Sequence, residues 1–568
     1  MPSVLDRRIQ EAVGRITGPE GRLPLTSFER DGQTLPMIAA APPALSHYFA
    51  HFCALHAEKD FLVAGEERLS FAAIYAAAQD VAHALVGRFG VARGDRVGIA
   101  MRNCPSWIVC YMGVLMAGGV ATLLNGWWQG NELAEGIAST GTRLVLADPL
   151  RTERLAAHAD AHGASVIPLD VNQPIGAAIA PLIEGGIRGE LPQLSGDDLA
   201  TILFTSGSTG QCKGAYSDHR GVIQGAFNYL VQTLAMLDIM TQDGTPPTLQ
   251  PATLLNVPLF HVTAEVPVFL QSFAMGRKLV LMPKWDAEEA MRLMEQEKVT
   301  YFVGVPLMSY EMLTHPKRGN YDLSTVASFA AGGAPRPPEH VKRLNDEMGG
   351  GKPLLGYGLT ETNAVGCGNV NENYLAKPES TGPAAKPLVD LAILDDDGRP
   401  VPQGMRGEVS IRSICNFRGY WKNEPATRAC MTADGYFRTG DIGYLDADGY
   451  LFIVDRKKDI IIRGGENISC QEVEAAIYAH PDVAEAAVFG LADARFGEVP
   501  GAVIHLHAGR VLTDDGLKGF LGERLAAFKL PCRYWFVDDP LPRLGTEKID
   551  KVSIREKYRS LAALQAVD

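Results

Sequence analysis

Thr205-Ser206-Gly207-Ser208-Thr209-Gly210-Gln211-Cys212-Lys213-Gly214 is the most informative stretch of this sequence. It carries four hydroxyl side chains, three glycines and one lysine. Glycine exposes backbone N–H groups and permits close approach, hydroxyls add hydrogen-bond donors, and the lysine adds a positive charge. The apolar residues 199–204 predict a strand that leads into this loop. The pattern therefore predicts a polyphosphate site, although an ordinary surface loop can have a similar composition.

The loop differs from the Walker phosphate loop, because Cys212 precedes the lysine and Gly214, rather than Ser or Thr, follows it. It resembles the phosphate-binding signature of the adenylate-forming (AMP-binding) superfamily, which includes acyl-CoA synthetases, adenylation domains and luciferases. The family pattern is Thr-Ser-Gly-Ser/Thr-Thr-Gly-x-Pro-Lys-Gly, so Cys212 replaces a proline. Proline contributes no donor, so this departure should alter the rigidity of the loop more than its chemistry. The resemblance implies that the phosphates of ATP are bound by Thr205, Ser206, Gly207, Ser208, Thr209, Gly210 and Lys213.

The composition is typical of a globular enzyme. A chain of 568 residues can form several packed units, and a hydrophobic content of 46% with 21% charged residues is ordinary. A net charge of −13 argues against nucleic acid as a partner, because phosphate contacts need a basic surface. Nine cysteines without paired spacing predict buried thiols in a reducing compartment.

No membrane segment or signal peptide is expected. The N-terminal segment is charged early, from Asp6 to Arg8, and has no apolar signal region. The uncharged run 103–131 is interrupted by Pro105, the pair Gly118-Gly119 and Asn125, which predict a helix, a turn and a buried strand. These features predict a cytoplasmic protein.

Short apolar strands alternate with helices along most of the chain. Ser70 predicts the N-cap of a helix with apolar residues at helical spacing, and residues 96–100 and 120–124 predict strands. Such alternation predicts an α/β fold with mainly parallel sheets flanked by helices. Together with the resemblance, it implies a large N-terminal domain of several subdomains and a small, mobile α+β C-terminal domain.

Further blocks after the loop resemble those of the same family and occur in the same order. Phe260-His261 implies a border of the acyl pocket, whereas a histidine without this context is usually structural. Glu361 is a hard oxygen ligand suited to Mg²⁺, which the resemblance implies it holds together with Thr205. Contacts to adenine and the α-phosphate are implied for Gly333, Ala334, Pro335, Gly356, Tyr357, Gly358 and Thr360.

The acyl pocket is expected along residues 259–268, 302–308 and 356–365. These stretches are mostly apolar. They predict a hydrophobic carboxylic acid as substrate, either a medium-to-long aliphatic acid or an aryl acid.

The domain boundary is expected at the charged segment 455–459. The resemblance implies that Asp441 holds the ribose hydroxyls, that Arg456 faces the nucleotide and that Lys458 occupies a hinge. It implies an ATP- and acyl-binding domain at 1–457 and a mobile lid at 458–568. An Asp448-Gly449 turn predicts a hairpin just before this boundary.

The lid is expected to carry two functional elements. Lys548 resembles the lysine that serves adenylation, although Glu547 stands beside it where the family has glycine. Gly464-Gly465 implies a loop without side chains that leaves a channel for the pantetheine arm of CoA. Ser469 and Glu472 predict a capping box that starts a helix after this loop.

The resemblance implies an ATP-dependent acid–CoA ligase with catalytic roles for Lys548, Glu361, Thr205 and His261. A carboxylate attacks the α-phosphate of ATP-Mg²⁺ to give acyl-AMP and pyrophosphate, and the thiol of CoA then displaces AMP. The alternatives are transfer to a separate carrier protein, luciferase-like oxidative decarboxylation and a non-catalytic acyl- or nucleotide-binding homologue. Neither the particular acid nor a homodimeric assembly is decided by the sequence.

Overall fold

A computed structural model describes residues 3–205, 212–333, 336–464, 466–493, 495–544 and 548–564. The chain divides into two compact units. The first comprises residues 1–391 and 411–437, and the second comprises residues 392–410 and 438–568. The two units are described separately below.

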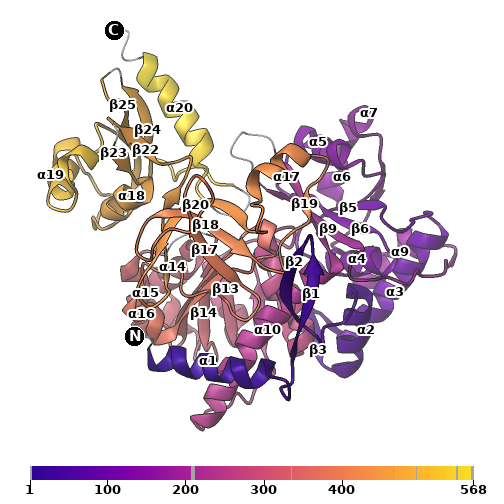
Figure 1. Cartoon of the computed structure of the whole chain (residues 1–568). Helices are drawn as coiled ribbons and strands as arrows, with labels where there is room; N and C mark the ends of the chain where they lie inside the picture. The colour runs from indigo at the N-terminus through magenta and orange to yellow at the C-terminus, as the bar shows by residue number, and fades with distance from the viewer. Residues whose placement is uncertain are drawn as a thin grey trace. The chain divides into compact units, whose positions relative to one another are not determined.

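A seven-stranded sheet in the first unit contains the two strands that flank the predicted phosphate loop (Figure 1). Its strand order is β19-β10-β9-β6-β5-β7-β8. The five strands from β9 to β8 are parallel, and β10 and β19 add antiparallel neighbours at one edge. The strands are β5 (Arg96–Ala100), β6 (Val120–Leu123), β7 (Leu144–Ala147), β8 (Ser165–Pro168), β9 (Leu199–Thr205), β10 (Lys213–Asp218) and β19 (Gly419–Tyr420).

An eight-stranded sheet forms the second layer of the first unit. Its order is β16-β15-β14-β13-β11-β12-β3-β4, with six parallel strands between two antiparallel edges. The strands are β3 (Asp60–Ala64), β4 (Glu67–Ser70), β11 (Ala252–Leu255), β12 (Lys278–Leu281), β13 (Tyr301–Gly304), β14 (Ser328–Gly332), β15 (Lys352–Tyr357) and β16 (Cys367–Val370). Two mainly parallel sheets confirm the predicted fold class.

The helices of the first unit begin where local sequence signals predict. The Ser70 hydroxyl accepts from the Ala73 N–H and caps α3 (Phe71–Gly87). The helix α4 (Pro105–Met116) is buried along its whole length and is followed by β6, which confirms the predicted helix, turn and strand. Among the helices of the described residues, none combines the length and apolar character that a membrane span requires.

The other helices complete the layers around the two sheets. A hairpin of β1 (Leu25–Arg30) and β2 (Gln33–Ile38) also belongs to this unit. The helices used below are α10 (His219–Gln242), α13 (Ala287–Gln296), α14 (Pro306–Thr314), α15 (Pro338–Glu347) and α16 (Asn371–Ala376). Met294, Met312 and Leu344, from α13, α14 and α15, share one buried cluster with Phe329 of β14.

The second unit contains two smaller sheets. The first has the order β17-β18-β20-β21, and β20 and β21 form the predicted hairpin, with Gly449 at a φ of 81°. The second has five strands, with β26 beside β25. The strands are β17 (Asp390–Leu394), β18 (Gly407–Arg412), β20 (Phe437–Leu445), β21 (Leu451–Arg456), β22 (Ile461–Arg463), β23 (Glu466–Ile468), β24 (Val483–Asp493), β25 (Gly497–Leu506) and β26 (Arg533–Val537).

Helices pack on the five-stranded sheet of the second unit. The Ser469 hydroxyl accepts from the Glu472 N–H at the start of α18 (Cys470–Tyr478), as predicted. The helix α19 (Asp514–Gly522) ends at a glycine, a residue of low helix propensity. The chain then runs to α20 (Lys551–Leu564).

The apolar stretch 262–269 is helical and mostly buried: a short α-helical turn, α11 (Val262–Ala264), leads into the π-helix η1 (Glu265–Leu270). One expectation needs correction. The cysteines are free, but Cys212 and Cys532 are exposed, whereas buried thiols were expected. Both lie in connecting segments, where chain packing does not cover the side chain.

Candidate functional site

Thr205 and Lys213 flank the predicted phosphate loop and lie opposite each other. They are register partners at the adjoining ends of the antiparallel strands β9 and β10. The Thr205 hydroxyl lies 3.5 Å from the Lys213 carbonyl oxygen and donates to it. Residues 206–211 lie outside the described part of the chain, including Ser206, Gly207, Ser208, Thr209 and Gly210.

Tyr420 connects Glu361 to this pair of strands, because it contacts both Glu361 and Lys213. Glu361 belongs to the short 3-10 helix η3 (Thr360–Thr362) and is only 7% exposed. The Tyr420 hydroxyl donates to a carboxylate oxygen of Glu361 at 2.7 Å. The Lys213 ammonium lies 5.0 Å from the centre of the Tyr420 ring, within reach of a cation–π contact. The structure therefore brings Thr205, Lys213 and Glu361 into one cluster.

Tyr420, the hydrogen-bond partner of the predicted metal ligand Glu361, was missed by the sequence analysis. It lies in β19, where it pairs with Ala215 of β10. Burial and the adjacent Glu361 carboxylate raise the pKa of the Tyr420 hydroxyl far above its ordinary value, so it stays a neutral donor. In the sequence, the only local feature that pointed to Tyr420 was its position directly after Gly419.

The predicted adenine-side segments meet at the ends of two neighbouring strands. Gly332 of β14 is the register partner of Gly356 in β15, so Gly333 and Tyr357 follow at the same edge. Gly333 has a φ of 78°, a conformation that favours glycine. A Cβ on Gly358 would lie 2.0 Å from the Ala364 carbonyl oxygen, so only glycine fits there. Ala334 and Pro335 lie outside the described residues.

His261 has a structural contact at the position predicted to border the acyl pocket. Its Nδ1 accepts from the Thr263 N–H at 3.2 Å and so caps α11. Thr263, two residues after His261, lies close to the end of β14. A Cβ on Gly332, the last residue of that strand, would lie 3.8 Å from the Thr263 methyl carbon. The segment 261–263 is thus near β14, whereas a role of the imidazole in the site stays a prediction.

Glu265 is a buried carboxyl group that the sequence analysis did not identify. It is fully buried on the π-helix η1, and the Tyr111 hydroxyl donates to its Oε1 at 2.7 Å. Burial raises the pKa of Glu265 to about 7, an effect that the Tyr111 hydrogen bond opposes. Glu265 lies on a π-helix that follows His261. π-helical segments are frequent at functional sites, but this association alone assigns no role to Glu265.

The second unit brings together the other predicted site residues. Asp441 and Arg456 are register partners in β20 and β21, and the Arg456 Nε lies 2.6 Å from an Asp441 carboxylate oxygen. Asp441 is 3% exposed. Lys548 lies near this pair: burial and the positive Arg456 lower its pKa to about 8, while Asp441 acts in the opposite direction.

The predicted CoA loop is described in part. Gly464 has a φ of 59°, and its N–H donates to the Phe496 carbonyl oxygen at 2.7 Å. Gly465 and Glu547 lie outside the described residues. The consequence of Glu547 therefore stays a prediction.

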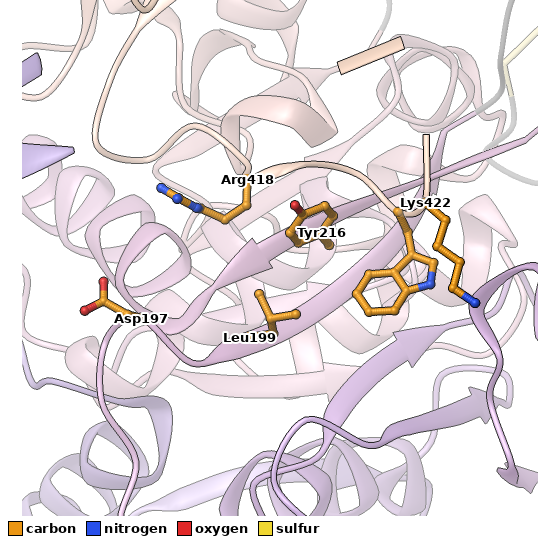
Figure 2. A pocket seen from close by; sticks show the side chains of 6 residues that line it. Asp197, Leu199, Tyr216, Arg418 and Lys422 are labelled. Atoms are coloured by element: carbon orange, nitrogen blue, oxygen red, sulfur yellow. The ribbon is translucent and has the colours of Figure 1, made fainter. Parts of the chain in front are cut away.

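A surface pocket lies beside the predicted phosphate site but is formed by other residues. Figure 2 shows the side chains that line it, all from the first unit. They are Asp197, Leu199, Tyr216, Arg418, Trp421 and Lys422. Arg418 has a carboxylate neighbour in Asp31 at 3.4 Å, so its charge is already compensated. None of the predicted site residues lines this pocket.

The cluster fits the metal requirement of an ATP-dependent reaction. The described residues contain no group of three or more His, Cys, Asp or Glu that could form a closed metal site. Mg²⁺ does not need one, because it commonly uses one or two protein oxygens, several waters and the phosphates of the substrate. A carboxylate at Glu361 and a hydroxyl at Thr205 are donors of this kind.

Comparison with known proteins identifies the family. The family of AMP-binding enzymes matches residues 49–421, and the C-terminal domain of AMP-binding enzymes matches residues 472–548. The chain belongs to the AMP-binding enzyme family.

Curated relatives and solved structures agree with this assignment. A feruloyl-CoA synthase of an Amycolatopsis species is 34% identical over 471 residues, which cover 83% of this chain and 90% of the relative. A long-chain-fatty-acid–CoA ligase of Mycobacterium tuberculosis, FadD13, is 33% identical over 500 residues, which cover 86% and 93%. The structure of ATP-bound MatB from Rhodopseudomonas palustris is similar with a TM-score of 0.80 at 29% identity, covering 91% and 99%.

These findings confirm the predicted family and enzyme class, an AMP-forming acid–CoA ligase that uses ATP, Mg²⁺ and CoA.

Proposed function

We propose that this AMP-forming acid–CoA ligase activates a hydrophobic carboxylic acid, either a medium- or long-chain fatty acid or an aryl acid. The acid becomes acyl-AMP with release of pyrophosphate, and CoA then accepts the acyl group with release of AMP. The observation that carries the proposal is the cluster of Lys213, Tyr420 and Glu361 at the strand ends that flank the phosphate loop.

The first half-reaction brings two anions together, so its catalytic requirement is charge neutralisation and positioning. Lys213 and the loop 205–210 bind the phosphates, and Tyr357 and Gly333 lie against the adenine. Asp441 accepts hydrogen bonds from the ribose hydroxyls, with Arg456 beside the nucleotide. Lys548 stabilises the negative charge as the carboxylate attacks the α-phosphate and pyrophosphate leaves.

Glu361 and Thr205 would hold Mg²⁺, which neutralises phosphate charge when it is bound. Tyr420 keeps the Glu361 carboxylate in place through its 2.7 Å hydrogen bond. Because the phenol stays neutral, it orients Glu361 without cancelling its charge. Thr360 donates to the α-phosphate, and His261 borders the acyl group.

The second half-reaction needs different groups at the same carbon. We place the lid at residues 458–568, with a hinge at the charged segment 455–459, so that rotation exchanges Lys548 for the loop at Gly464-Gly465. This loop has no side chains to obstruct the pantetheine arm. The CoA sulfur then attacks the acyl carbonyl carbon, the bond to the AMP oxygen breaks, and AMP leaves.

The range of acids follows from the predicted pocket. The stretches 259–268, 302–308 and 356–365 are mostly apolar. The relatives include an enzyme named for an aryl acid and one named for long-chain fatty acids. Both classes therefore belong in a substrate panel. We also propose a cytoplasmic location, and a homodimer is the assembly to be tested.

The test is pyrophosphate release with ATP-Mg²⁺ across aliphatic and aryl acids, with and without CoA, with the products identified by mass. Acyl-CoA and AMP with a hydrophobic acid are the expected products. Acyl-AMP that accumulates despite CoA would contradict CoA as the acceptor and indicate a carrier protein. ATP binding without turnover of any acid would contradict catalysis, and short polar acids as the best substrates would contradict the apolar pocket.

A further inference from the structure

Arg336 is a buried cation without an anionic partner in the described part of the chain. It is 3% exposed and lies between β14 and α15. Its terminal nitrogens make only long contacts, at 3.4 and 3.5 Å to the Phe329 carbonyl oxygen and 3.4 Å to the Ser309 hydroxyl. Its Nε has no hydrogen-bond partner among the described residues. No described carboxylate is among the groups that act on its charge.

These contacts explain part of the arrangement but not the charge. The Phe329 carbonyl belongs to the parallel ladder between β14 and β15, so Arg336 adds only further, long contacts to it. A carbonyl and a hydroxyl are neutral, and they do not compensate a buried guanidinium. A buried cation that lacks a partner is costly, because it has lost its water without gaining an opposite charge.

Two further polar groups near Arg336 lack partners. Tyr374 of α16 is fully buried, and no described group hydrogen-bonds its hydroxyl. His340 of α15 stacks on Tyr310 of α14 with ring centres 4.2 Å apart, and its Nδ1 is likewise without a partner in the described residues. Burial lowers the pKa of His340 to about 4, and the Arg336 charge acts in the same direction, so the ring is neutral.

The chemistry of this group of side chains favours an anionic ligand. Arg336 provides a positive charge and an open N–H. Tyr374 provides a hydroxyl without a described partner, and it shares a buried cluster with Ala331 of β14 and Val341 of α15, the two elements that flank Arg336. A guanidinium fork matches the two oxygens of a carboxylate and binds them with charge-assisted hydrogen bonds. No described acidic residue competes for that place.

The position in the fold connects this group to the predicted acyl site. Ser309 follows the last residue of the predicted pocket wall 302–308, and Arg336 is three residues after Gly333. The two segments follow β13 and β14, which are adjacent and parallel, so both leave the sheet at the same edge. Ligands of parallel α/β sheets bind at this edge.

We propose that Arg336, with Ser309 and Tyr374, binds a second carboxylate at the far end of the acyl substrate. This inference rests on the proposed function and narrows it: the acid has an apolar middle and an acidic tail. The carboxylate to be activated lies at the adenylate site, and the distal carboxylate compensates the guanidinium. Arg336 is then a specificity-determining residue of the ligase.

The test compares three matched acids on the full-length protein: α,ω-dicarboxylic acids of six to twelve carbons, their monomethyl esters, and monocarboxylic acids of equal length. Initial rates of acyl-CoA formation give kcat and KM for each. For the best length, we expect kcat/KM for the diacid to exceed that for its half-ester by about 100-fold, because a site built for a polar group rejects analogues that lack it. The KM for ATP should be the same with either acid.

Two variants and one control assign the preference to this site. Arg336→Gln should remove the preference for the diacid by raising its KM, with little change for the monocarboxylic acid. Tyr374→Phe should weaken the preference in the same direction and keeps the bulk of the ring if Arg336→Gln does not fold. Arg343→Gln is the control, because Arg343 lies on α15 but is paired with Glu347 and partly exposed; it should behave as wild type.

The outcomes separate this inference from the proposed function. Turnover of monocarboxylic acids with no preference for any diacid would overturn the distal carboxylate site and leave the ligase function intact. If kcat/KM fell equally for all three acids in both variants, Arg336 would have a structural role, and this result would also overturn the inference. No turnover of any acid by wild type would contradict the proposed function itself.

Discussion

Two carboxylates of this enzyme are held in opposite ways. In the first unit, Glu361 accepts a hydrogen bond from the neutral phenol of Tyr420. In the second unit, Asp441 is paired with the guanidinium of Arg456 at 2.6 Å. A phenol fixes a carboxylate and leaves its negative charge, whereas a guanidinium fixes it and offsets that charge. The first arrangement suits a metal ligand, and the second suits a carboxylate that needs only to accept hydrogen bonds from a neutral diol.

Lys213 and Lys548, the lysines near these two carboxylates, also have different surroundings. Lys213 lies over the Tyr420 ring in the first unit. Lys548 is near Arg456 in the second unit, and burial and this like charge lower its pKa to about 8. A destabilised ammonium gains most when a negative charge arrives, because the new partner offsets both burial and repulsion. Lys548 is therefore the group we expect to respond most strongly to the developing charge of adenylation.

The largest effect is expected for Lys548→Ala. Adenylation, measured as pyrophosphate release, should fall by about 100- to 1,000-fold, in line with the loss of one preorganised transition-state contact. Thioester formation from supplied acyl-adenylate and CoA should persist. Lys557→Ala, an exposed position on α20, is the control and should leave both steps unchanged. An equal fall in both steps would refute the division of labour within the lid.

The second largest effect is expected for Glu361, the carboxylate that accepts the hydrogen bond from Tyr420. Glu361→Gln should reduce adenylation by about 100-fold and raise the Mg²⁺ concentration needed for half-maximal rate, since it removes a metal-binding charge. Tyr420→Phe keeps the charge and removes one hydrogen bond to it, so a loss of about 10-fold is expected. Titration of Mg²⁺ distinguishes the two. An unchanged Mg²⁺ requirement in Glu361→Gln would show that Glu361 is not a metal ligand.

A smaller effect is expected at the guanidinium-held carboxylate. Asp441→Asn should raise the KM for ATP by about 10-fold through weaker hydrogen bonds to the ribose, with kcat little changed. Wild type should also discriminate against 2′-deoxy-ATP or 3′-deoxy-ATP, and the variant should lose that discrimination. If the variant still distinguishes ATP from both analogues, Asp441 does not contact the ribose.

The last effect concerns pH and is the smallest near neutrality, because it appears only above about pH 8. The Lys548 ammonium is charged below about pH 8 and becomes neutral as the pH rises through its lowered pKa. The kcat/KM of adenylation in the free enzyme should therefore decline above pH 8, by up to about 10-fold for each pH unit. Lys548→Arg, whose guanidinium keeps its proton, should lack this decline at a lower overall rate. A profile that declines equally in both proteins would assign the titration to another group.

Local signals predicted many of the elements well. Ser70 caps α3, the Asp448-Gly449 turn joins β20 and β21, and residues 96–100 form β5, because caps, turns and strands depend on neighbouring residues. The prediction of buried thiols was wrong for Cys212 and Cys532, which are exposed.

The candidate site was predicted unevenly for the same reason. Thr205, Lys213 and Glu361 were identified because their motifs are continuous in the sequence, and the structure brings them together. Tyr420 was missed because its partner Glu361 is 59 residues away and is reached only through the pairing of β19 with β10. Glu265 and Arg336 were missed because burial, not residue type, makes them unusual.

The sequence alone determined the order of the motifs, and with it the family, the α/β class and the residue types available for ATP, Mg²⁺ and CoA. These follow from short-range chemistry, since a glycine-rich loop, a capping serine or an acidic residue has its character before the chain folds. Only the tertiary structure decided which side chains share an environment. Strand register placed a phenol on Glu361 and a guanidinium on Asp441, and packing buried Arg336 away from the described carboxylates. Such pairings arise from segments far apart in the chain, and the free energy of a buried charge depends on neighbours that the sequence does not place.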